Sequence, residues 1–315
     1  MRPLIILGCL GATLDINAQQ LDIPHKVVTI PNAAGRRASP AKWERGRLVQ
    51  IDHATSTVFA FDDQGQVVMS SRIWPANSLQ VRLYNMAVSP SGTYAVEGTA
   101  ISGEGAPTAF IVLIDAAGRT TKVVQTSPAA AFSLRFADDG TLWAVVRVHD
   151  DRFEEASDYD MLRHYDASGV LIQTALPRKR FHTKGCPMRL PILTTSGSKI
   201  GLYADVAMTW IELSFTGDVL GHWSFPTPDS GQRLQVQNVA LTDTGDLLVS
   251  ASTIGRNTKG KHGVYLFDRG SQTLGAVDST AVSSLDPVSL MGVDGDSLVT
   301  STSLAPGPLF WTKLR

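Results

Sequence analysis

The segment Phe136-Ala-Asp-Asp-Gly-Thr-Leu-Trp-Ala-Val-Val146 decides the fold, because its pattern returns along the whole chain. It contains the end of one strand, a short turn, and a second strand rich in branched and aromatic residues. An Asp or Ser placed three residues before the glycine can accept hydrogen bonds from the turn backbone, and glycine adopts the positive φ that other residues resist. The segment therefore predicts a β-hairpin.

Turns of this kind recur at a spacing of about fifty residues. The first series has its glycines at Gly46, Gly92, Gly140, Gly197, Gly245 and Gly295. A second series alternates with the first and ends at Gly65, Gly118, Gly169 and Gly217, with an altered copy at Phe267-Asp-Arg-Gly-Ser271. Segments such as Phe110-Ile-Val-Leu-Ile114 flank these turns and are typical of strands. Each period therefore holds two hairpins.

Two hairpins per period make one four-stranded antiparallel blade, so the repeats predict an all-β, six-bladed β-propeller that occupies residues 19–315 as a single domain. The last period stops one strand short, at Leu309-Phe-Trp-Thr-Lys313. The segment Lys26-Val-Val-Thr-Ile30 is expected to pair into that last blade and to close the ring. A hydrophobic fraction of 43% and a charged fraction of 18% fit such an ordered globular chain.

Residues 1–18 are typical of an export signal, which predicts a periplasmic or extracellular protein. Arg2 precedes an apolar run, and Ala18 provides a small residue for cleavage. A start codon placed inside a longer signal fits the same residues. No later segment approaches the ~20 apolar residues of a membrane helix.

The two cysteines offer little chemistry. Ile6-Leu-Gly-Cys9 is similar to a lipid-attachment sequence, so anchoring through Cys9 is an alternative to cleavage at Ala18. If Cys9 leaves with the signal, Cys186 is the single cysteine of the mature chain. The sequence then predicts neither an internal disulfide nor a zinc site.

Two repeats carry a resemblance to a known group of proteins. Asn85-Met-Ala-Val-Ser-Pro-Ser-Gly92 and Asn238-Val-Ala-Leu-Thr-Asp-Thr-Gly245 resemble the repeats of bacterial six-bladed propellers of the NHL-repeat, TolB-like and gluconolactonase-like superfamily. The resemblance covers the mature chain at the level of the fold. It implies a lactonase, a peptide binder or a scaffold, because the fold hosts all three.

The connections between hairpins are expected to gather on one face of the ring, opposite the tight turns. This second face, called the looped face below, receives the long connections 74–84, 99–109, 149–160, 177–189, 226–237, 253–262 and 278–287. Irregular loops on one face of a regular scaffold often bind a ligand. The residues that we select there as ligand-face candidates are Trp74, His149, Asp150, Asp151, Arg256 and His262.

Two of these loops have opposite charge. Residues 149–160 carry six carboxylates, whereas residues 177–189 are strongly basic. We expect the two loops to attract each other on the rim. A calcium site in the acidic loop is an alternative, and the basic loop, together with residues 256–262, is suited to an anionic or sugar-acid ligand. A formal net charge of -1 argues against nucleic acid as a partner.

The mouth of the central channel is the other candidate site. Strand A of each blade is expected to begin seven residues before its turn glycine, at Ser39, Asn85, Ser133, Leu190, Asn238 and Val288. Strand B is expected to end nearby with Asp52, Glu97 and Asp205. Carboxylates and amides in a ring would hold a metal ion, as the resemblance to gluconolactonase-like propellers implies. Alternatively, the two asparagines satisfy backbone groups at the strand ends.

Two hypotheses of different class therefore remain. The first is an exported, non-catalytic propeller that binds a protein, peptide or glycan through its looped face, without a cofactor. The second is a metal-dependent, lactonase-like hydrolase with its site around Asp52, Asn85, Glu97, Asp205 and Asn238. The chain has no Gly-x-Ser-x-Gly elbow, which leaves nucleophilic catalysis without support. Nothing in the sequence indicates the oligomeric state.

Overall fold

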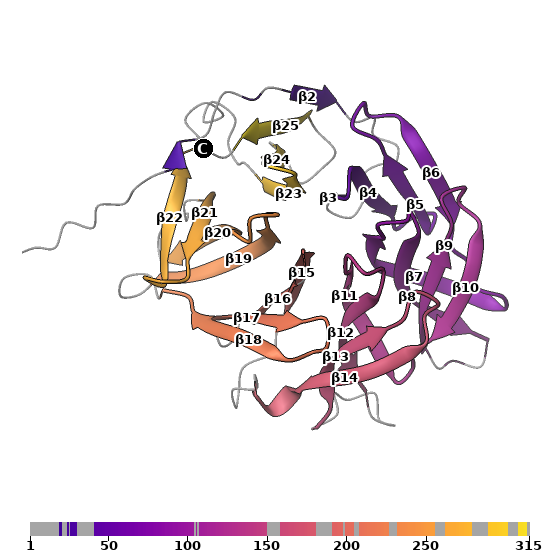
Figure 1. The fold of residues 1–315 in the computed structure, drawn as a ribbon. Coiled ribbons are helices and arrows are strands. Elements are labelled where there is room, and N and C mark those ends of the chain that lie inside the picture. Colours follow the sequence, from indigo (N-terminus) through magenta and orange to yellow (C-terminus); the bar gives the residue numbers. More distant parts are fainter. Residues whose placement is uncertain are drawn as a thin grey trace, which may run out of the picture.

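The computed structural model describes residues 19–20, 24, 26–29, 41–103, 105, 107–149, 158–180, 191–197, 199–204, 208–226, 232–255, 262–278, 289–301 and 308–313. Its strands form six sheets arranged around a central axis, so the predicted six-bladed propeller is confirmed (Figure 1). Within the described ranges the single helical element is a 3-10 turn, η2 (Arg178–Arg180). None of the described residues forms a helix long and apolar enough to cross a membrane.

The first three blades each contain four consecutive antiparallel strands, with the first strand nearest the axis (Figure 1). Blade 1 comprises β3 (Lys42–Glu44), β4 (Arg47–Asp52), β5 (Thr57–Phe61) and β6 (Val67–Arg72). Blade 2 comprises β7 (Ser78–Val88), β8 (Tyr94–Ser102), β9 (Pro107–Ile114) and β10 (Thr120–Gln125). Blade 3 comprises β11 (Ala129–Phe136), β12 (Leu142–Val148), β13 (Asp160–Tyr165) and β14 (Leu171–Pro177).

The remaining blades use the two ends of the chain. Blade 4 comprises β15 (Ile192–Ser196), β16 (Lys199–Ala204), β17 (Thr209–Ser214) and β18 (Val219–Ser224). Blade 5 comprises β19 (Gln232–Leu241), β20 (Leu247–Gly255), β21 (His262–Asp268) and β22 (Thr273–Asp278), and β1 (Gln19–Gln20) pairs in parallel with β22. Blade 6 comprises β23 (Ser289–Asp294), β24 (Ser297–Ser301), β25 (Pro308–Lys313) and β2 (Lys26–Thr29).

The ring closes as the sequence predicts. Strand β2, from the N-terminal part of the chain, pairs antiparallel with β25, and Lys26 lies opposite Trp311. The last blade is therefore completed by a strand that precedes the first one. The fifth strand of blade 5, β1, was not predicted, because a segment of two residues carries no strand pattern of its own.

The turns that join the third and fourth strands confirm the predicted role of Asp. In blade 1, the Asp62 carboxylate accepts hydrogen bonds from the backbone N–H groups of Gln64 and Gln66, at 2.9 and 2.8 Å. Gly65 completes this turn with a φ of 79°. Asp166 of blade 3 repeats the arrangement, and these backbone hydrogen bonds hold the pKa of its carboxyl below the ordinary value. In blades 1 to 3 each such turn is therefore specified by an Asp and a Gly at fixed spacing, whereas Ser214 replaces the Asp in blade 4.

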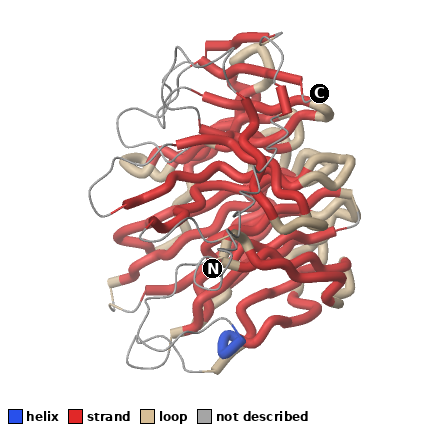
Figure 2. The backbone as a smooth tube through the Cα atoms, turned by 90° about the vertical axis from the view of Figure 1, so that its left-hand side faces the viewer, coloured by secondary structure: helices blue, strands red, loops and turns tan. Residues whose placement is uncertain are grey.

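The glycine turns of the hairpins lie at one end of the blades, and the connections between hairpins and between blades lie at the opposite end, which is the looped face (Figure 2). Part of what the sequence assigned to loops is strand. Strands β7 and β8 run to Ser78 and Ser102, and β19 and β20 run to Gln232 and Gly255. The loop assignment of residues 78–84, 99–102, 232–237 and 253–255 was therefore wrong, because these residues pair as extensions of the inner hairpins of blades 2 and 5.

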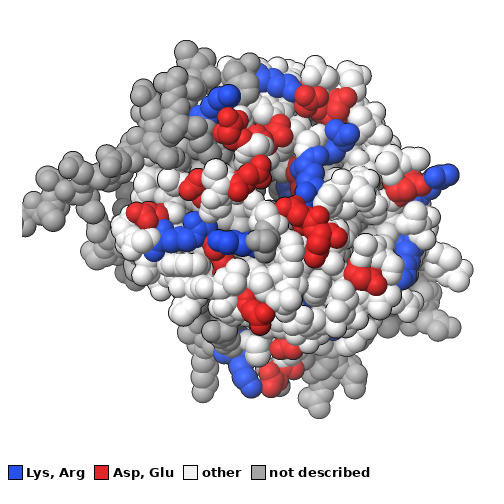
Figure 3. Space-filling view, in the orientation of Figure 1, with Lys and Arg blue, Asp and Glu red and all other residues white. Residues whose placement is uncertain are grey.

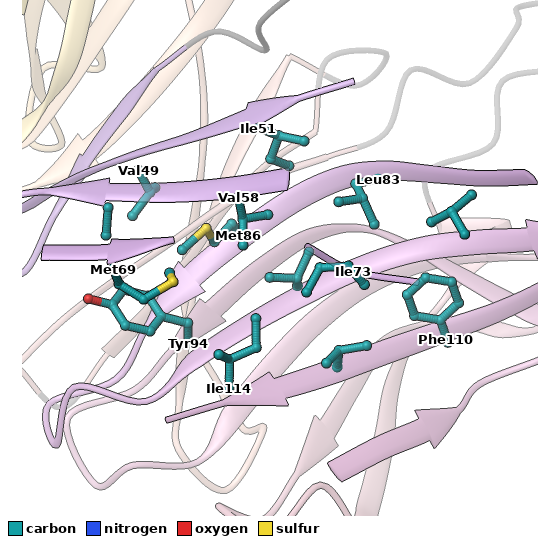
Figure 4. Close-up of a cluster of buried hydrophobic side chains, with 14 of the residues drawn as sticks. Val49, Ile51, Val58, Met69, Ile73, Leu83, Met86, Tyr94, Phe110 and Ile114 are labelled. Carbon is teal, nitrogen blue, oxygen red and sulfur yellow. The ribbon is translucent and has the colours of Figure 1, made fainter. Parts of the chain in front are cut away.

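The core is divided into six clusters, one between each pair of neighbouring blades. Figure 4 shows the cluster between blades 1 and 2, where Val49 and Ile51 of β4 face Leu83 and Met86 of β7. Tryptophans occupy several of these clusters. Trp43, Trp143, Trp210 and Trp311 are all buried.

Candidate functional site

The inner strands of the six blades line a central channel that holds two cavities. The larger has a volume of about 690 Å³, lies at the looped face and is lined by residues of every blade. The smaller has a volume of about 240 Å³ and lies among the tight turns, where Arg45 pairs with Asp138. Figure 3 shows the face of the tight turns, on which acidic and basic side chains are interspersed. Arg135, Asn238 and Met291 line both cavities.

One position on the inner strand is equivalent in all six blades, and in blades 1 and 3 the residue at this position lines the floor of the larger cavity. The hairpin registers place Lys42 of β3 and Arg135 of β11 at this position, whereas the other blades carry Ala87, Thr194, Ala240 and Gly292. A Cβ atom on Gly292 would lie 2.3 Å from the Trp43 carbonyl oxygen, so blade 6 can approach blade 1 only with glycine here. The floor of the larger cavity thus carries two long cations, whereas Thr194, Ala240 and Gly292 line the smaller cavity.

Lys42 connects the first two blades. Its ammonium group donates a hydrogen bond to the Met86 carbonyl oxygen at 2.5 Å and lies 2.6 Å from the Glu44 carboxylate. Burial and the neighbouring charge of Arg135 lower the pKa of Lys42 to about 8, and Glu44 partly offsets them. Lys42 is therefore largely protonated at pH 7.

Arg135 is the second buried cation of the floor. Its side chain is 8% exposed, and Nη1 donates a hydrogen bond to the Leu134 carbonyl oxygen at 2.8 Å. Burial lowers its pKa, and the charge of Glu44 partly offsets that effect. A guanidinium group keeps its charge under these conditions because its ordinary pKa is so high.

Aromatic residues form one wall of the larger cavity. The rings of Tyr84 on β7 and Phe132 on β11 lie 5.7 Å apart between centroids, and both line the cavity. The Tyr84 hydroxyl is 2.9 Å from Thr99 Oγ1, which fixes the ring on the extended hairpin. The Arg147 guanidinium lies 5.5 Å from the centre of the Phe132 ring. This wall offers an apolar surface that flat rings can contact.

Hydrogen-bonding groups form the opposite wall, on blade 5. Gln237 Nε2 donates to Ser252 Oγ at 2.7 Å, and Ser252 Oγ lies 3.0 Å from His262 Nδ1. Ser250 Oγ is 3.4 Å from His262 Nε2. Gln237, Ser252 and His262 all line the cavity. The predicted ligand-face residue His262 is therefore part of the cavity wall.

Gln50 adds a buried amide to the lining. Its side chain is 1% exposed, and neither its amide oxygen nor its amide nitrogen has a hydrogen-bond partner among the described residues. A buried amide without partners costs free energy. Gln50 is therefore suited to receive a hydrogen bond from a molecule that enters the cavity.

Asn85 and Asn238 connect neighbouring blades at the cavity edge. Asn85 Nδ2 donates to the Phe132 carbonyl oxygen at 3.3 Å, and Asn238 Nδ2 donates to the Leu290 carbonyl oxygen at 3.0 Å. The predicted position of these residues at the start of strand A was wrong. Both lie inside long strands, next to a β-bulge that turns the side chain toward the next blade. Of the other predicted starts, Ser133 follows a similar bulge, and Ser39, Leu190 and Val288 lie outside the described residues.

Loss of either amide is expected to weaken the ring. Asn238→Ala should lower the free energy of unfolding by about 1–2 kcal/mol, because a backbone carbonyl loses its donor. Asn85→Ala should have a similar effect, and urea unfolding measures both. Unchanged stability combined with the loss of a bound divalent cation would instead identify the amides as metal ligands.

Glu97 lies deep between blades 2 and 3. Its side chain is 1% exposed, and neither carboxyl oxygen has a hydrogen-bond partner among the described residues. Burial raises the pKa of the Glu97 carboxyl well above its ordinary value, although Lys42 attracts the charged form. The carboxyl is therefore held in its neutral form over a wider pH range than usual, and it does not line the cavity.

Replacement of Glu97 should change how stability depends on pH. The folded protein holds the Glu97 proton more tightly than the unfolded chain, so stability is lost as pH rises above the ordinary pKa of a glutamate. Glu97→Gln should raise the melting temperature at pH 8 relative to the parent protein and have little effect at pH 4. An equal shift at both pH values would contradict this account.

The remaining candidates for a metal site are Asp52 and Asp205. Asp52 accepts hydrogen bonds from Ala54 N at 2.9 Å and Thr55 Oγ1 at 2.7 Å, so it stabilises the turn after β4. Asp205 lies outside the described residues. Across the described part of the chain, no group of three His, Cys, Asp or Glu side chains is placed to hold a metal ion.

The other ligand-face candidates lie away from the cavity or outside the described residues. Trp74 is 44% exposed, donates its indole N–H to the Ser78 carbonyl oxygen at 3.0 Å and has the Arg72 guanidinium 5.0 Å from its ring. The backbone N–H of His149 donates to the Pro128 carbonyl oxygen at 3.1 Å. Asp150, Asp151, Arg256, Cys9 and Cys186 lie outside the described residues.

The ends of the acidic and basic loops of blade 3 lie side by side, as predicted. Lys179 Nζ is 3.8 Å from the Asp158 carboxylate, and both side chains are exposed. The Arg178 backbone N–H donates to the Tyr159 carbonyl oxygen at 2.8 Å. Such an exposed ion pair contributes little to stability, about 0–1 kcal/mol.

Sequence reasoning missed Lys42, Arg135, Gln50, Tyr84 and Gln237. Their local sequences resemble those of ordinary surface positions. The two cations could have been recognised as equivalent residues if the length of the turn between the first two strands of each blade had been taken into account. Blades 1, 4 and 6 use a two-residue turn, so counting back from the turn glycine does not reach equivalent positions in all blades.

Comparison with solved structures shows propellers of mixed function. A presumed exported protein from Bacteroides fragilis is 11% identical, with a TM-score of 0.57 and coverage of 95% of this chain and 98% of that one. A member of the DUF4221 family from Bacteroides vulgatus is 9% identical, with a TM-score of 0.56 and coverage of 95% and 99%. A gluconolactonase from Xanthomonas campestris is 15% identical, with a TM-score of 0.50 and coverage of 92% and 89%.

These likenesses concern the fold alone, because the identities are so low. No family model matches the chain, and no curated protein matches it. The fold-level resemblance to bacterial propellers that the repeats indicated is thereby confirmed. The function has to be argued from the cavity itself.

Proposed function

We propose that the protein is an exported, non-catalytic binding module that takes a small, hydroxyl-rich ligand of glycan type into the larger cavity from the looped face. The observation that carries this proposal is the cavity of about 690 Å³ with chemically distinct walls. Small-molecule sites in proteins typically measure about 300–1,000 Å³ and combine apolar surface with a few placed polar groups. The cavity has both features.

The polar wall supports a ligand with several hydroxyl groups. Gln237, Ser252 and His262 offer donors and acceptors, and the buried amide of Gln50 has no partner within the described part of the structure. The Tyr84 ring offers an apolar face on the other side. Sugars use both kinds of contact, because their ring faces are apolar and their edges are polar.

Export is proposed together with this function. Residues 1–18 have the pattern of a signal, and the similar propeller from Bacteroides fragilis is a presumed exported protein. Binding modules for small polar nutrients or cell-wall fragments are useful outside the cytoplasm. More broadly, the looped face could bind a protein or peptide partner.

The metal-dependent hydrolase has less support. The floor of the cavity carries Lys42 and Arg135, which would repel a divalent cation. We predict that neither calcium nor a chelator changes the melting temperature of the protein. A calcium-dependent rise that survives replacement of residues 149–160 and disappears in Asn238→Ala would favour the hydrolase instead.

A blocked cavity tests the proposal. Ligand-observed NMR with a mixture of mono- and disaccharides, neutral and acidic, should detect binding to the parent protein. Ser252→Tyr places a bulky ring in the cavity wall and should abolish the signals. Thr120→Tyr, on the outermost strand β10 of blade 2, is the matched control and should retain them. Equal binding by both variants would contradict the proposal.

A further inference from the structure

We infer that the ligand of the larger cavity carries a carboxylate group that binds between Lys42 and Arg135. This inference rests on the proposed function and specifies the ligand class as a monocarboxylic acid with a hydroxylated ring. The two cations stand at equivalent positions of blades 1 and 3, on either side of Ala87 in blade 2. Both cations line the larger cavity, so a ligand inside it can reach them.

The charges at the floor do not balance. Lys42 and Arg135 contribute two positive charges, and Glu44 compensates one of them from 2.6 Å. The carboxylate of Asp138, in the smaller cavity, is paired with Arg45. Glu97 lies outside the lining of the larger cavity. Among the described residues, the floor therefore has an excess of one positive charge, which a monoanion would neutralise.

The two cations also provide suitable hydrogen-bond donors. The Arg135 guanidinium has five N–H groups, and the described structure records one hydrogen bond from them, to Leu134 O. A planar carboxylate can accept two parallel hydrogen bonds from such a group. Arg135 lines the cavity even though it is only 8% exposed.

The walls of the larger cavity favour a particular kind of ring as the part of the ligand that carries the carboxylate. The amide and hydroxyl groups of blade 5 lie on one side of the cavity, and the rings of Tyr84 and Phe132 lie on the other. A ring with hydroxyl groups at its edge would contact both sides while its acid group reaches the floor. A dianion such as phosphate would leave one negative charge uncompensated at this depth. The chemistry therefore favours a sugar acid of uronate type.

Pairs of acidic and neutral compounds test the inference. Isothermal titration at fixed ionic strength compares sodium D-glucuronate and sodium D-galacturonate with D-glucose and D-galactose. The acids are expected to bind about 10- to 100-fold more tightly than the neutral sugars, because hydrogen bonds to charged groups are the stronger ones. Arg135→Gln should reduce the affinity for the acids to that for the neutral sugars, and Arg135→Lys should retain part of the preference.

Controls separate this inference from the proposed function. Arg119→Gln removes an exposed cation from a turn of blade 2 and should leave the preference unchanged. Equal affinity for acids and neutral sugars would overturn the inference and leave the proposed function standing. Failure of every compound to bind would overturn both. If Arg135→Gln does not fold, the comparison of acids with neutral sugars on the parent protein still tests the inference. Lys42→Met is then the second variant, in which the preference for acids should also fall.

Discussion

Replacement of Glu212 by alanine is expected to lower the free energy of unfolding by about 3–5 kcal/mol, because it leaves two cations without their buried partner. Glu212 lies on β17, its side chain is 2% exposed, and Lys199 Nζ lies 3.1 Å from Oε2. Arg269, on a tight turn of blade 5, donates from Nε to Oε1 at 2.7 Å. The indole N–H of Trp210 donates to the same oxygen at 3.0 Å. The carboxylate thus joins blades 4 and 5.

The effect should depend on pH. Burial alone would raise the pKa of the Glu212 carboxyl, but the hydrogen bonds from Trp210, Arg269 and Lys199 outweigh burial and lower the pKa below its ordinary value. The contribution of Glu212 is therefore present above the ordinary pKa of a glutamate and is lost as pH falls through the lower value of the folded protein. Urea unfolding at pH 7 and pH 3 measures this.

Glu212→Gln is the matched control for this network. It keeps the acceptor for Trp210 but removes the charge, so its cost at pH 7 should lie between zero and that of the alanine variant. A loss of less than about 1 kcal/mol in Glu212→Ala would contradict the account, since such a value is typical of an exposed ion pair.

Replacement of Trp311 by alanine should have a comparable effect, about 3–5 kcal/mol, by opening a cavity at the closure of the ring. Trp311 lies on β25, packs edge-on against Trp43 of blade 1 at 5.0 Å between ring centroids, and donates its indole N–H to Asp294 Oδ2 at 3.0 Å. Lys26 of β2 lies 4.8 Å from its ring centre. One side chain therefore contacts the last blade, the first blade and the closing strand.

The exposed Trp74 provides the control for this substitution. Trp74→Ala should change the stability by about 0.5 kcal/mol or less, as is usual for surface substitutions. Trp311→Phe should fall between the two. Thermal and urea unfolding of the three variants would contradict the account if Trp311→Ala were no more destabilised than Trp74→Ala.

The fold could be predicted from the sequence because its determinants are local. Each turn between the third and fourth strands is specified by residues such as Asp62 and Gly65, whose hydrogen bonds and φ angle depend on four or five neighbours. The closing strand was predictable for a different reason: the last period lacked one strand, and residues 26–30 had no other partner. Both arguments require no knowledge of contacts between distant side chains.

The position of the site could not be predicted in the same way. The turn glycines look alike in sequence, but the turns that they end differ in length. Counting the same number of residues back from Gly46 or Gly295 therefore reaches a different position on the inner strand than counting back from Gly140. In a strand, an error of one residue turns a side chain to the opposite face. A β-bulge in several inner strands adds a further residue. Asn85 and Asn238 were therefore taken for strand starts, although both do line the larger cavity, and Lys42 and Arg135 were overlooked.

The charged residues show a further limit. Lys42 and Lys122 look alike in sequence, because each lies in a short strand near a turn. Lys122 lies on the outermost strand of blade 2, where it donates to the Ser168 carbonyl oxygen at 2.6 Å. Lys42 lies on an inner strand, where burial lowers its pKa to about 8. The difference arises from the position of the strand within the blade, which only the assembled ring defines.

The most direct test of the central claim is the crystal structure of the protein soaked with the tightest-binding sugar acid from the titrations. The account predicts a molecule in the larger cavity, with its ring between Tyr84 and Gln237 and its carboxylate within hydrogen-bond distance of Arg135. A molecule bound at the face of the tight turns, or on the outer strands with the larger cavity vacant, would contradict it.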